Sequence, residues 1–444
     1  MFNKILIANR GEIAVRIIRA CREMGIRTVA VYSEADRDAL HTQLADEAVC
    51  IGKAQSSDSY LNMERILSAT IATKAEAIHP GFGFLSENSR FVEMCEKCNV
   101  AFIGPSAEVI SRMGNKSEAK NTMRKAKVPV VPGTKEPVYT VEQALEAVKE
   151  IGFPVMIKAS AGGGGKGMRV AGNEQEFAKL FETAQQESVH SFSDNTMYLE
   201  RFVENPRHVE VQILADKYGN VVHLGERDCS VQRRHQKMIE ESPCIAISDD
   251  LRKKMGETAV RAAKAAGYES AGTIEFLLDQ SGEFYFMEMN TRIQVEHPVT
   301  EWVTGVDLVK EQIRIASGLP LSCRQEDIHL TGHAIECRIN AENPEKGFRP
   351  SPGTITDMYL PGGKGIRIDS AIYSGYTIPP YYDSMVAKLI VWAKNRQEAI
   401  HKMQSALGEV IIEGIDTNVD YQYGIVNHPD YIEGNIDIEF IERL

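Results

Sequence analysis

The chain has 444 residues, which is enough for two or three domains. Its composition, with 43% hydrophobic and 25% charged residues, is that of an ordinary globular protein. The net charge of −12 argues against a broad surface for nucleic acid or anionic membranes, and no run of about 18 apolar residues predicts a membrane span. The N-terminal stretch MFNKILIANRGE lacks the layout of a signal peptide, so we expect a soluble, cytoplasmic protein with no nucleic-acid or membrane partner.

The N-terminal part of the chain has the pattern of a parallel sheet. Apolar residues from Ile13 to Met24 recur at helical spacing between two predicted strands, which is the pattern of a βαβ unit. The connecting turn NRGE has one glycine, whereas a dinucleotide-binding loop needs G-x-G-x-x-G. We therefore predict a Rossmann-like domain over 1–113 without a pyrophosphate loop. Its predicted strands are KILIAN (4–9), RTVAVYSEAD (27–36), EAIHPG (76–81) and AFIGPS (101–106).

Two further domains are predicted, one over 114–330 and a C-terminal α+β domain over 331–444. Helices are expected at 115–126, 249–266 and 396–409. The strands predicted for the middle domain are FPVMIKAS (153–160), MRVAG (168–172), YLERFV (198–203), RHVEVQILAD (207–216), NVVHLGERD (220–228) and GTIEFLLD (272–279). In the last domain, strands are predicted at GHAIECRINAE, GTITDMYL and DSMVAKLIVWA.

Eight cysteines are scattered along the chain, and only Cys95 and Cys98 form a C-x-x-C pair. A zinc site usually needs a second pair or histidines at ligand spacing, and neither lies in this segment. We therefore expect reduced thiols, most of them in the core.

The glycine-rich segment SAGGGGKG (160–167) lies between two short predicted strands, as the tip of a hairpin would. A flexible linker is one interpretation. The other is a mobile lid whose free backbone N–H groups and Lys166 hold an anion such as a phosphate. The segment is not a P-loop, because neither Ser or Thr nor a helix follows the lysine.

Two acidic residues are predicted to share one face of a hairpin. If residues 279–282 form a four-residue loop between GTIEFLLD and EFYFMEMN, Glu275 lies diagonal to Glu288, about 7–8 Å away. With the amide oxygen of Asn290, these carboxylates match the hard oxygen ligands of Mg²⁺. The alternative is an exposed sheet face with an isolated acidic pair.

Within the stretch FMEMNTRIQVEHPVTE (286–301), residues 287–296 would place five polar side chains on one face of a strand, so we expect a strand whose polar face continues beyond Asn290 to Glu296. On that face Arg292 could hold an anion whose proton Glu296 removes, although a structural ion pair is the alternative. The basic cluster QRRHQK (232–237) is interpreted as a second anion site rather than a solvated basic surface.

Taken in order, these motifs resemble the biotin carboxylase component of the biotin-dependent carboxylases, an ATP-grasp enzyme, over about residues 3–440. The stretches that carry the resemblance are KILIANRGEIAVRIIRA, HPGFGFLSEN, SAGGGGKGMRV, YLERFV, QRRHQK and GTIEF…EMNTRIQVEHPVTE. The resemblance implies α/β and α+β architecture: a Rossmann-like pre-ATP-grasp domain, an ATP-grasp domain with a mobile lid at about 130–204, and a C-terminal α+β biotin carboxylase domain. Phe82 stands where the family often has tyrosine.

Site residues are also implied by this resemblance. Those expected to bind ATP are Lys116, Lys158, Gly164, Gly165 and Lys166 at the phosphates, Glu200, Arg201, Phe202 and Val203 at adenine, His208, Gln232 and His235 at the ribose and phosphates, and the metal ligands Glu275 and Glu288. Asn290 completes the metal ligands. The expected bicarbonate and biotin residues are Lys237, Arg292, Gln294, the Val295 amide, Glu296 as the base and Arg338 at the biotin enolate, and those expected to be catalytic are Lys237, Arg292, Glu296 and Arg338.

The implied activity is that of a ligase, ATP-dependent carboxylation of biotin by bicarbonate through carboxyphosphate, with Mg²⁺ or Mn²⁺ and two ions expected. The chain has no A-M-K-M biotin-attachment motif. We therefore expect the biotin on a separate biotin carboxyl carrier protein, carboxyltransferase subunits as further partners, and a homodimer. The implied setting is acetyl-CoA carboxylase, which makes malonyl-CoA for fatty-acid synthesis.

Two alternatives remain at this point. Another ATP-grasp ligase, such as a carbamoyl-phosphate or purine-pathway enzyme, would share Glu275, Glu288 and the glycine lid but would not need Arg338. A catalytically inactive nucleotide sensor would have lost metal ligands or the base, and this sequence keeps all of them.

Overall fold

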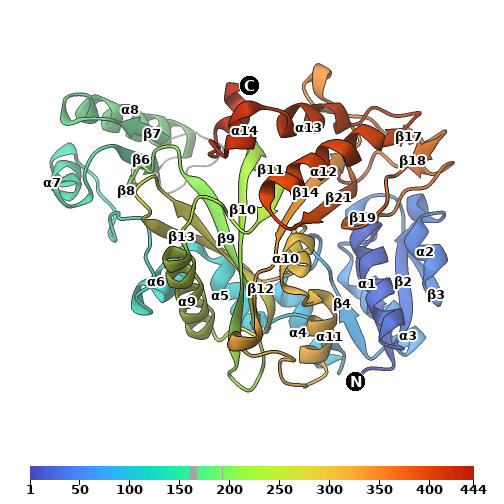
Figure 1. The fold of residues 1–444 in the computed structure, drawn as a ribbon. Coiled ribbons are helices and arrows are strands. Elements are labelled where there is room, and N and C mark those ends of the chain that lie inside the picture. The colour runs from blue at the N-terminus through green and yellow to red at the C-terminus, as the bar shows by residue number, and fades with distance from the viewer. Residues whose placement is uncertain (160–167, 193) are drawn as a thin grey trace. The chain divides into compact units, whose positions relative to one another are not determined.

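The computed structural model describes residues 1–159, 168–192 and 194–444 (Figure 1). The chain forms two compact units, and both ends of the chain belong to the first. The first unit consists of Met1–Val128, Arg207–Phe276 and Glu288–Leu444, and the second of Pro129–Pro206 and Leu277–Met287. None of the helices in the described part of the chain combines the length and the apolar character needed to cross a membrane.

A five-stranded parallel sheet forms the N-terminal part of the first unit, in the order β3-β2-β1-β4-β5, as the Rossmann-like prediction requires. Its strands are β1 (Lys4–Ile7), β2 (Arg27–Ser33), β3 (Glu47–Gly52), β4 (Ala77–His79) and β5 (Ala101–Phe102). The strand β3 was not predicted, and its alternating burial at an edge of the sheet explains why no continuous apolar run announces it.

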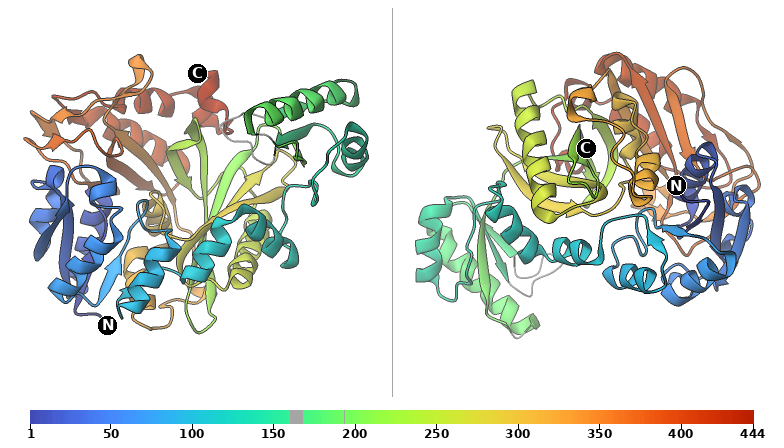
Figure 2. Two further views of the ribbon diagram at one scale, coloured as in Figure 1. Left: turned by 180° about the vertical axis from the view of Figure 1, so that it is seen from behind. Right: turned by 90° about the horizontal axis from the view of Figure 1, so that it is seen from below.

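Helices cover both faces of this sheet, as Figure 2 shows from behind. Ile5 and Ile7 point to the face covered by α1 and α11, whereas Leu6 and Ala8 point to the face covered by α3 and α4. The helices of this region are α1 (Gly11–Glu23), α2 (Leu40–Leu44), α3 (Met63–Thr73), α4 (Ser89–Lys97), α5 (Ala107–Gly114), α6 (Lys116–Lys125) and α11 (Leu308–Ala316).

An eight-stranded sheet joins the middle of the chain to its C-terminal part, in the order β13-β12-β9-β10-β11-β14-β21-β19. Its strands are β9 (Arg207–Ala215), β10 (Val221–Arg233), β11 (Gln236–Ser242), β12 (Ser270–Leu278), β13 (Phe284–Asn290), β14 (His333–Asn340), β19 (Ile366–Ser370) and β21 (Met385–Ala393). Strands from both sides of residue 330 pair here, β11 with β14. The domain boundaries given above remain predictions.

The two faces of β14 and β21 pack against different helices. Ile335, Cys337 and Leu389 point to one face and pack with Met403 of α12 in an apolar core. Ala334 and Ile390 of the same strands point to the opposite face, where they pack with Val299 and Val303 of α10. Helices of this part are α9 (Asp249–Ala266), α10 (His297–Thr304), α12 (Arg396–Glu409), α13 (Val419–Val426) and α14 (Pro429–Glu433). Short pairs complete it: β15 (Glu342–Asn343) with β16 (Arg349–Pro350), β17 (Gly353–Thr354) with β20 (Thr377–Ile378), and β18 (Met358–Tyr359) with β22 (Ile411–Ile412).

The second unit has a three-stranded antiparallel sheet, β7-β6-β8, with helices packed on it. Its elements are β6 (Val155–Ala159), β7 (Met168–Ala171), β8 (Met197–Arg201), α7 (Val141–Ile151) and α8 (Glu174–Phe192). The predicted hairpin is confirmed where it is described, because β6 and β7 pair from Val155 opposite Ala171 to Lys158 opposite Met168. The glycine segment 160–167, predicted as its tip, lies outside the described residues.

The prediction that the strand and its polar face continue to Glu296 is wrong beyond Asn290. Strand β13 ends there, residues 291–296 form a loop, and α10 begins at His297 with Glu296 at its N-cap. The backbone N–H and hydroxyl of Thr291 both donate to the Glu87 carboxylate, at 3.0 and 3.1 Å, which directs the chain away from the sheet. Pro298, in the first turn of α10, favours a helix start there. The connection before β13 is also longer than assumed and runs over 279–283.

Candidate active site

A lysine ammonium surrounded by carboxylates forms the centre of the site. The Nζ atom of Lys237, on β11, lies 2.6 Å from Glu210, 3.0 Å from Glu275 and 2.7 Å from Glu296. Gln294 adds its side-chain oxygen at 3.4 Å and donates from its amide nitrogen to Glu275, at 2.8 Å. One cation therefore connects three buried carboxylates that come from two strands and a helix N-terminus.

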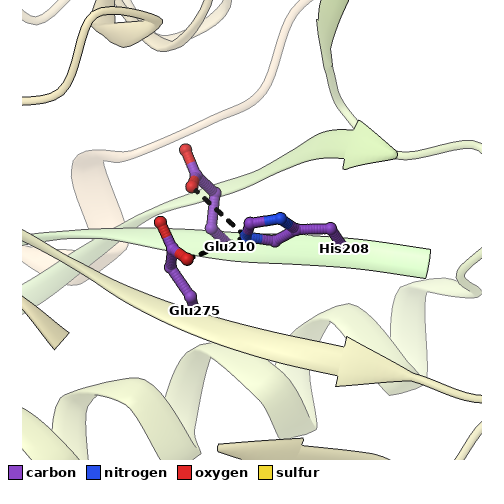
Figure 3. Close-up of side chains that lie close together, drawn as sticks. All are labelled: His208, Glu210 and Glu275. Atoms are coloured by element: carbon purple, nitrogen blue, oxygen red, sulfur yellow. Dashed lines mark ion pairs between the residues drawn. The ribbon is translucent and has the colours of Figure 1, made fainter. Parts of the chain in front are cut away.

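Alternation along β9 places His208 and Glu210 on the same side of the strand, facing Glu275 of the neighbouring β12 (Figure 3). The Nε2 atom of His208 lies 2.9 Å from Oε2 of Glu275 and 4.0 Å from Oε2 of Glu210. Gln212 continues the same row and accepts a hydrogen bond from Arg227 at 2.7 Å. The polar face of β9 thus forms one wall of the site.

Arg227, on β10, supports this wall from within the protein, and its side chain is completely buried. Its Nε donates to Oε1 of Glu210 at 2.6 Å, and its remaining N–H groups reach Gln212, Thr273 and Thr300. A buried carboxylate needs such compensation, because the loss of hydration alone costs several kcal/mol per ion.

The pKa values divide these carboxyl groups into two kinds. Burial alone raises the pKa of Glu275, but the charges of Lys237 and His208 outweigh it and hold the pKa well below its ordinary value. Burial likewise opposes ionisation of Glu296, and here Lys237, Arg338 and Arg227 outweigh it, so that its pKa is also well below the ordinary value. For Glu210, burial wins and the pKa is raised. Glu296 is therefore ionised in this state of the protein.

The loop over 291–296 carries the remaining anion-site candidates, and it brings Gln294 and Glu296, but not Arg292, to Lys237. The Nε atom of Arg292 donates to Glu87 at 3.0 Å, and one of its Nη atoms donates to Asn290 at 3.2 Å. Gln294 and Glu296 turn toward Lys237, as described above. On one face of a straight strand, every second side chain is about 7 Å from the next. Because the chain leaves the sheet after Asn290, Gln294 and Glu296 can approach the same cation more closely than that spacing would allow.

Arg338, on β14, lies on the far side of Glu296. Its guanidinium is 3.0 Å from Oε2 of Glu296 and 2.6 Å from Oε1 of Glu240 on β11. Burial raises the pKa of Glu240 to about 7, against the opposing effect of Arg338. Since Lys237 binds the other oxygen of Glu296, this carboxylate is bound by a cation on each side.

The predicted metal ligands fit a hard cation. Glu275 accepts from the amide of Asn290 at 2.8 Å. Loss of water around its carboxyl group and the charge of Glu275 raise the pKa of Glu288, and a divalent cation between the two carboxylates would remove that repulsion. Two other sets of donor atoms lie within 4.8 Å of one another, His208 with Glu210 and Glu275, and Cys229 with Glu210 and Glu296. In both sets the ammonium of Lys237 already occupies the position of a cation.

The other predicted ATP residues are more widely distributed. In the first unit, Lys116 begins α6, Gln232 lies opposite Lys237 in the β10–β11 pair, and His235 lies in the turn between these strands. In the second unit, Lys158 of β6 forms an ion pair with Glu200 of β8. The residues that follow Glu200 at the end of β8 are Arg201, Phe202 and Val203. Gly164, Gly165 and Lys166 lie outside the described residues.

Sequence reasoning missed four residues that the structure places at the site: Glu87, Glu210, Arg227 and Glu240. A signal existed for Glu210, because HVEVQ carries three polar side chains at alternate positions of a strand that was itself predicted. Arg227 also lay in a predicted strand, but its partners are separated from it by up to 73 residues. No local pattern announces such a contact.

Three family models match the chain one after another. The models described as "Biotin carboxylase, N-terminal domain", "Carbamoyl-phosphate synthase L chain, ATP binding domain" and "Biotin carboxylase C-terminal domain" match residues 1–110, 115–324 and 336–443. Together they extend over almost the whole chain.

Relatives match the full length of the chain at high identity. A biotin carboxylase of Nostoc sp. is 58% identical over 100% of this chain and 99% of that protein. A pyruvate carboxylase subunit from Methanothermobacter thermautotrophicus is 54% identical over 100% of this chain and 90% of that protein. Among solved structures, the biotin carboxylase domain dimer of the 2-oxoglutarate carboxylase from Hydrogenobacter thermophilus, in complex with MgADP, ADP and bicarbonate, has a TM-score of 0.88 at 52% identity, covering 100% and 98% of the two chains.

Proposed function

This chain belongs to the biotin carboxylase family, and we propose that the cluster around Lys237 is the place where ATP and bicarbonate react to carboxylate biotin. The enzyme class is that of an ATP-dependent ligase with an ATP-grasp domain. What supports the assignment of the site is one observation: Glu296, the predicted base, is completely buried with Lys237 at one carboxylate oxygen and Arg338 at the other.

The proposed base must first be released from its cations. As long as Lys237 and Arg338 bind Glu296, its low pKa makes it a weak proton acceptor. A bicarbonate ion that enters beside them competes for the same two cations, because anions bind to arginine and ammonium groups. Glu296 then loses compensation, its pKa rises, and it can take the proton of the ion that displaced it. In this proposal, substrate binding itself activates the base.

The steps that follow use the same residues. Deprotonated bicarbonate attacks the γ-phosphate of ATP to give carboxyphosphate and ADP, a transfer that depends mainly on positioning and on compensation of charge. Mg²⁺ held by Glu275, Glu288 and Asn290 would supply further positive charge at the phosphates. Carboxyphosphate then yields CO₂ and phosphate, the phosphate takes the ureido proton of biotin, and Arg338 stabilises the resulting oxyanion.

The finer setting is also a proposal. We infer a role in acetyl-CoA carboxylase, with biotin on a separate carrier protein, carboxyltransferase partners, a homodimeric state and a cytoplasmic location. The Nostoc relative, matched over 99% of its length and described as a biotin carboxylase, supports a stand-alone component, and a dimer is described for the 2-oxoglutarate carboxylase domain. Two relatives are described as parts of a pyruvate carboxylase and a 2-oxoglutarate carboxylase. Pyruvate and 2-oxoglutarate are therefore the alternative acceptors to compare with acetyl-CoA.

The test is ADP formation by the purified protein with bicarbonate, with and without free biotin. We expect biotin to stimulate turnover in the wild type and not in Arg338→Ala. The match to the ATP-binding domain of carbamoyl-phosphate synthase names the second candidate. Turnover that depends on ammonia and ignores biotin would favour that candidate and overturn the proposal.

A further inference from the structure

A second lysine, buried beside the site, contacts the loop that carries the proposed base. Lys388 lies in the middle of β21, and its side chain is completely buried. Its Nζ donates a hydrogen bond of 2.7 Å to the backbone oxygen of Val295, the residue that precedes Glu296. Burying an ammonium group costs free energy unless the group is paired and hydrogen-bonded. The partners of Lys388 therefore indicate why it is buried here.

Two carboxylates hold this ammonium in place. Oε1 of Glu12, on α1, lies 3.3 Å from Nζ of Lys388, and Oδ2 of Asp369, directly opposite on β19, lies 3.9 Å away. Arg367 binds both oxygens of Asp369, at 2.8 and 2.7 Å, so the charge of Asp369 has another partner. The Val295 oxygen is therefore the nearest acceptor of Lys388 in the described part of the chain.

The register of the sheet connects Lys388 to the site. In the β14–β21 pair, Arg338 and Lys388 are direct cross-strand partners, on the face covered by α10. Arg338 binds the side chain of Glu296, and Lys388 binds the peptide bond immediately before it. Two neighbouring cations of one sheet face thus fix the side chain and the main chain of the same residue.

We propose that Lys388 is a positioning residue of the carboxylation reaction, holding the Val295–Glu296 peptide so that the base and the bicarbonate-binding loop keep their geometry. This inference rests on the proposed function, because it gives Glu296 the role of base. It assigns Lys388 no contact with substrate. A displacement of about 1 Å in a reacting group can lower a rate by about 100-fold, which is enough for a distant contact to matter.

The experiment compares Lys388→Met in the wild type and in Glu12→Gln. The second background removes Glu12, the carboxylate nearest to Lys388, which would otherwise be left buried without this cation. Lys402→Met is the matched control, because Lys402 also donates to backbone oxygens, of Lys364 and Trp392, at 3.0 and 2.7 Å. The measured quantities are kcat for bicarbonate-dependent ATP turnover and the separate KM values for bicarbonate and ATP.

We expect Lys388→Met to lower kcat by about 10- to 100-fold and to raise the KM for bicarbonate in both backgrounds, with an unchanged KM for ATP. Lys402→Met keeps the wild-type values. The proposal is overturned if Lys388→Met has wild-type kinetics, or if both KM values increase equally. It is also overturned if the variant fails to fold in both backgrounds, because Lys388 would then serve stability. A wild type without biotin-dependent turnover would instead refute the proposed function, and this inference with it.

Discussion

The ammonium of Lys237 lies 2.7 Å from Oε1 of Glu296, and the guanidinium of Arg338 lies 3.0 Å from Oε2 of the same carboxylate. Both of these partners are cations that an incoming anion would also bind. The same contacts that keep the carboxylate ionised therefore also restrain it as a base until substrate binds.

Replacement of the base tests this arrangement. We expect Glu296→Gln to lower kcat of biotin-dependent ATP turnover by about 100- to 10,000-fold, the range of general base catalysis, because the amide cannot take a proton. ATP binding should persist, since Glu296 is not among the residues assigned to the nucleotide. Glu326→Gln, in an exposed pair with Arg324 at 3.6 Å, is the control and should keep the wild-type rate. Full activity of Glu296→Gln would show that another group removes the proton.

The metal assignment predicts a change in the Mg²⁺ requirement. Glu288→Gln removes one of the two carboxylates assigned to the expected ion, so we expect half-maximal ATP turnover to require at least about 10-fold more Mg²⁺. Glu283→Gln, in the connection before β13, changes charge by the same amount and should leave the Mg²⁺ titration unchanged. Coincident titrations of Glu288→Gln and the wild type would remove Glu288 from the metal ligands.

Stability should depend strongly on the buried arginine behind the site. Arg227→Gln removes one of the two cations that lie 2.6 Å from the buried carboxylate of Glu210, and breaking such a pair costs about 3–5 kcal/mol in the free energy of unfolding. The comparison is Arg27→Gln, whose arginine side chain is 62% exposed in its pair with Glu47, and for which we expect about 0–1 kcal/mol. Urea unfolding measures both. Equal losses would mean that the protein compensates Glu210 in another way.

A buried histidine of α2, next to the N-terminal sheet, predicts acid sensitivity. Burial lowers the pKa of His41 from 6.5 to about 4. Between these values the unfolded chain binds a proton at His41 and the folded chain does not, so the free energy of unfolding falls as the pH falls through this window. The loss is about 3 kcal/mol and is complete near pH 4, at about 1.4 kcal/mol for each unit of pKa.

The control for this effect is His41→Gln, which cannot titrate. Unfolding free energies of the two proteins between pH 7 and pH 4 should converge as the pH falls, because only the wild type loses the contribution of His41. His79, whose pKa burial lowers to about 3, is common to both and cancels. Parallel pH profiles would show that His41 is protonated in the folded protein as readily as in the unfolded one.

Local signals in the sequence predicted much of the fold. The helix expected at 249–266 has those bounds, because Ser248 caps its N-terminus and Gly267 adopts the left-handed conformation at its end. The alternation of apolar and polar residues predicted β12 and the start of β13, although the side chains of β12 are buried on both faces.

The interior of the site was predicted less well, because its residues contact partners that are far away in the sequence. Extending the alternation past Asn290 failed because Glu87, about 200 residues earlier, takes the hydrogen bonds of Thr291 and ends the strand. Arg227 was missed because its charge is compensated across strands. Lys388, whose Val295 contact spans 93 residues, lies in a predicted strand that looks like any other buried segment.

The direct pairing of Arg338 with Lys388 sets a rule for the variation that this protein can tolerate. The segment between their two strands, residues 341–384, can gain or lose residues at its turns and leave both cations where they are. A single insertion inside β14 or β21, ahead of either residue, would turn every later side chain of that strand to the opposite face. Arginine or lysine would then point into the apolar core beside α12. The reaction therefore depends on the two-residue repeat of side-chain direction within β14 and β21, and hardly at all on the length of the segment that joins these strands.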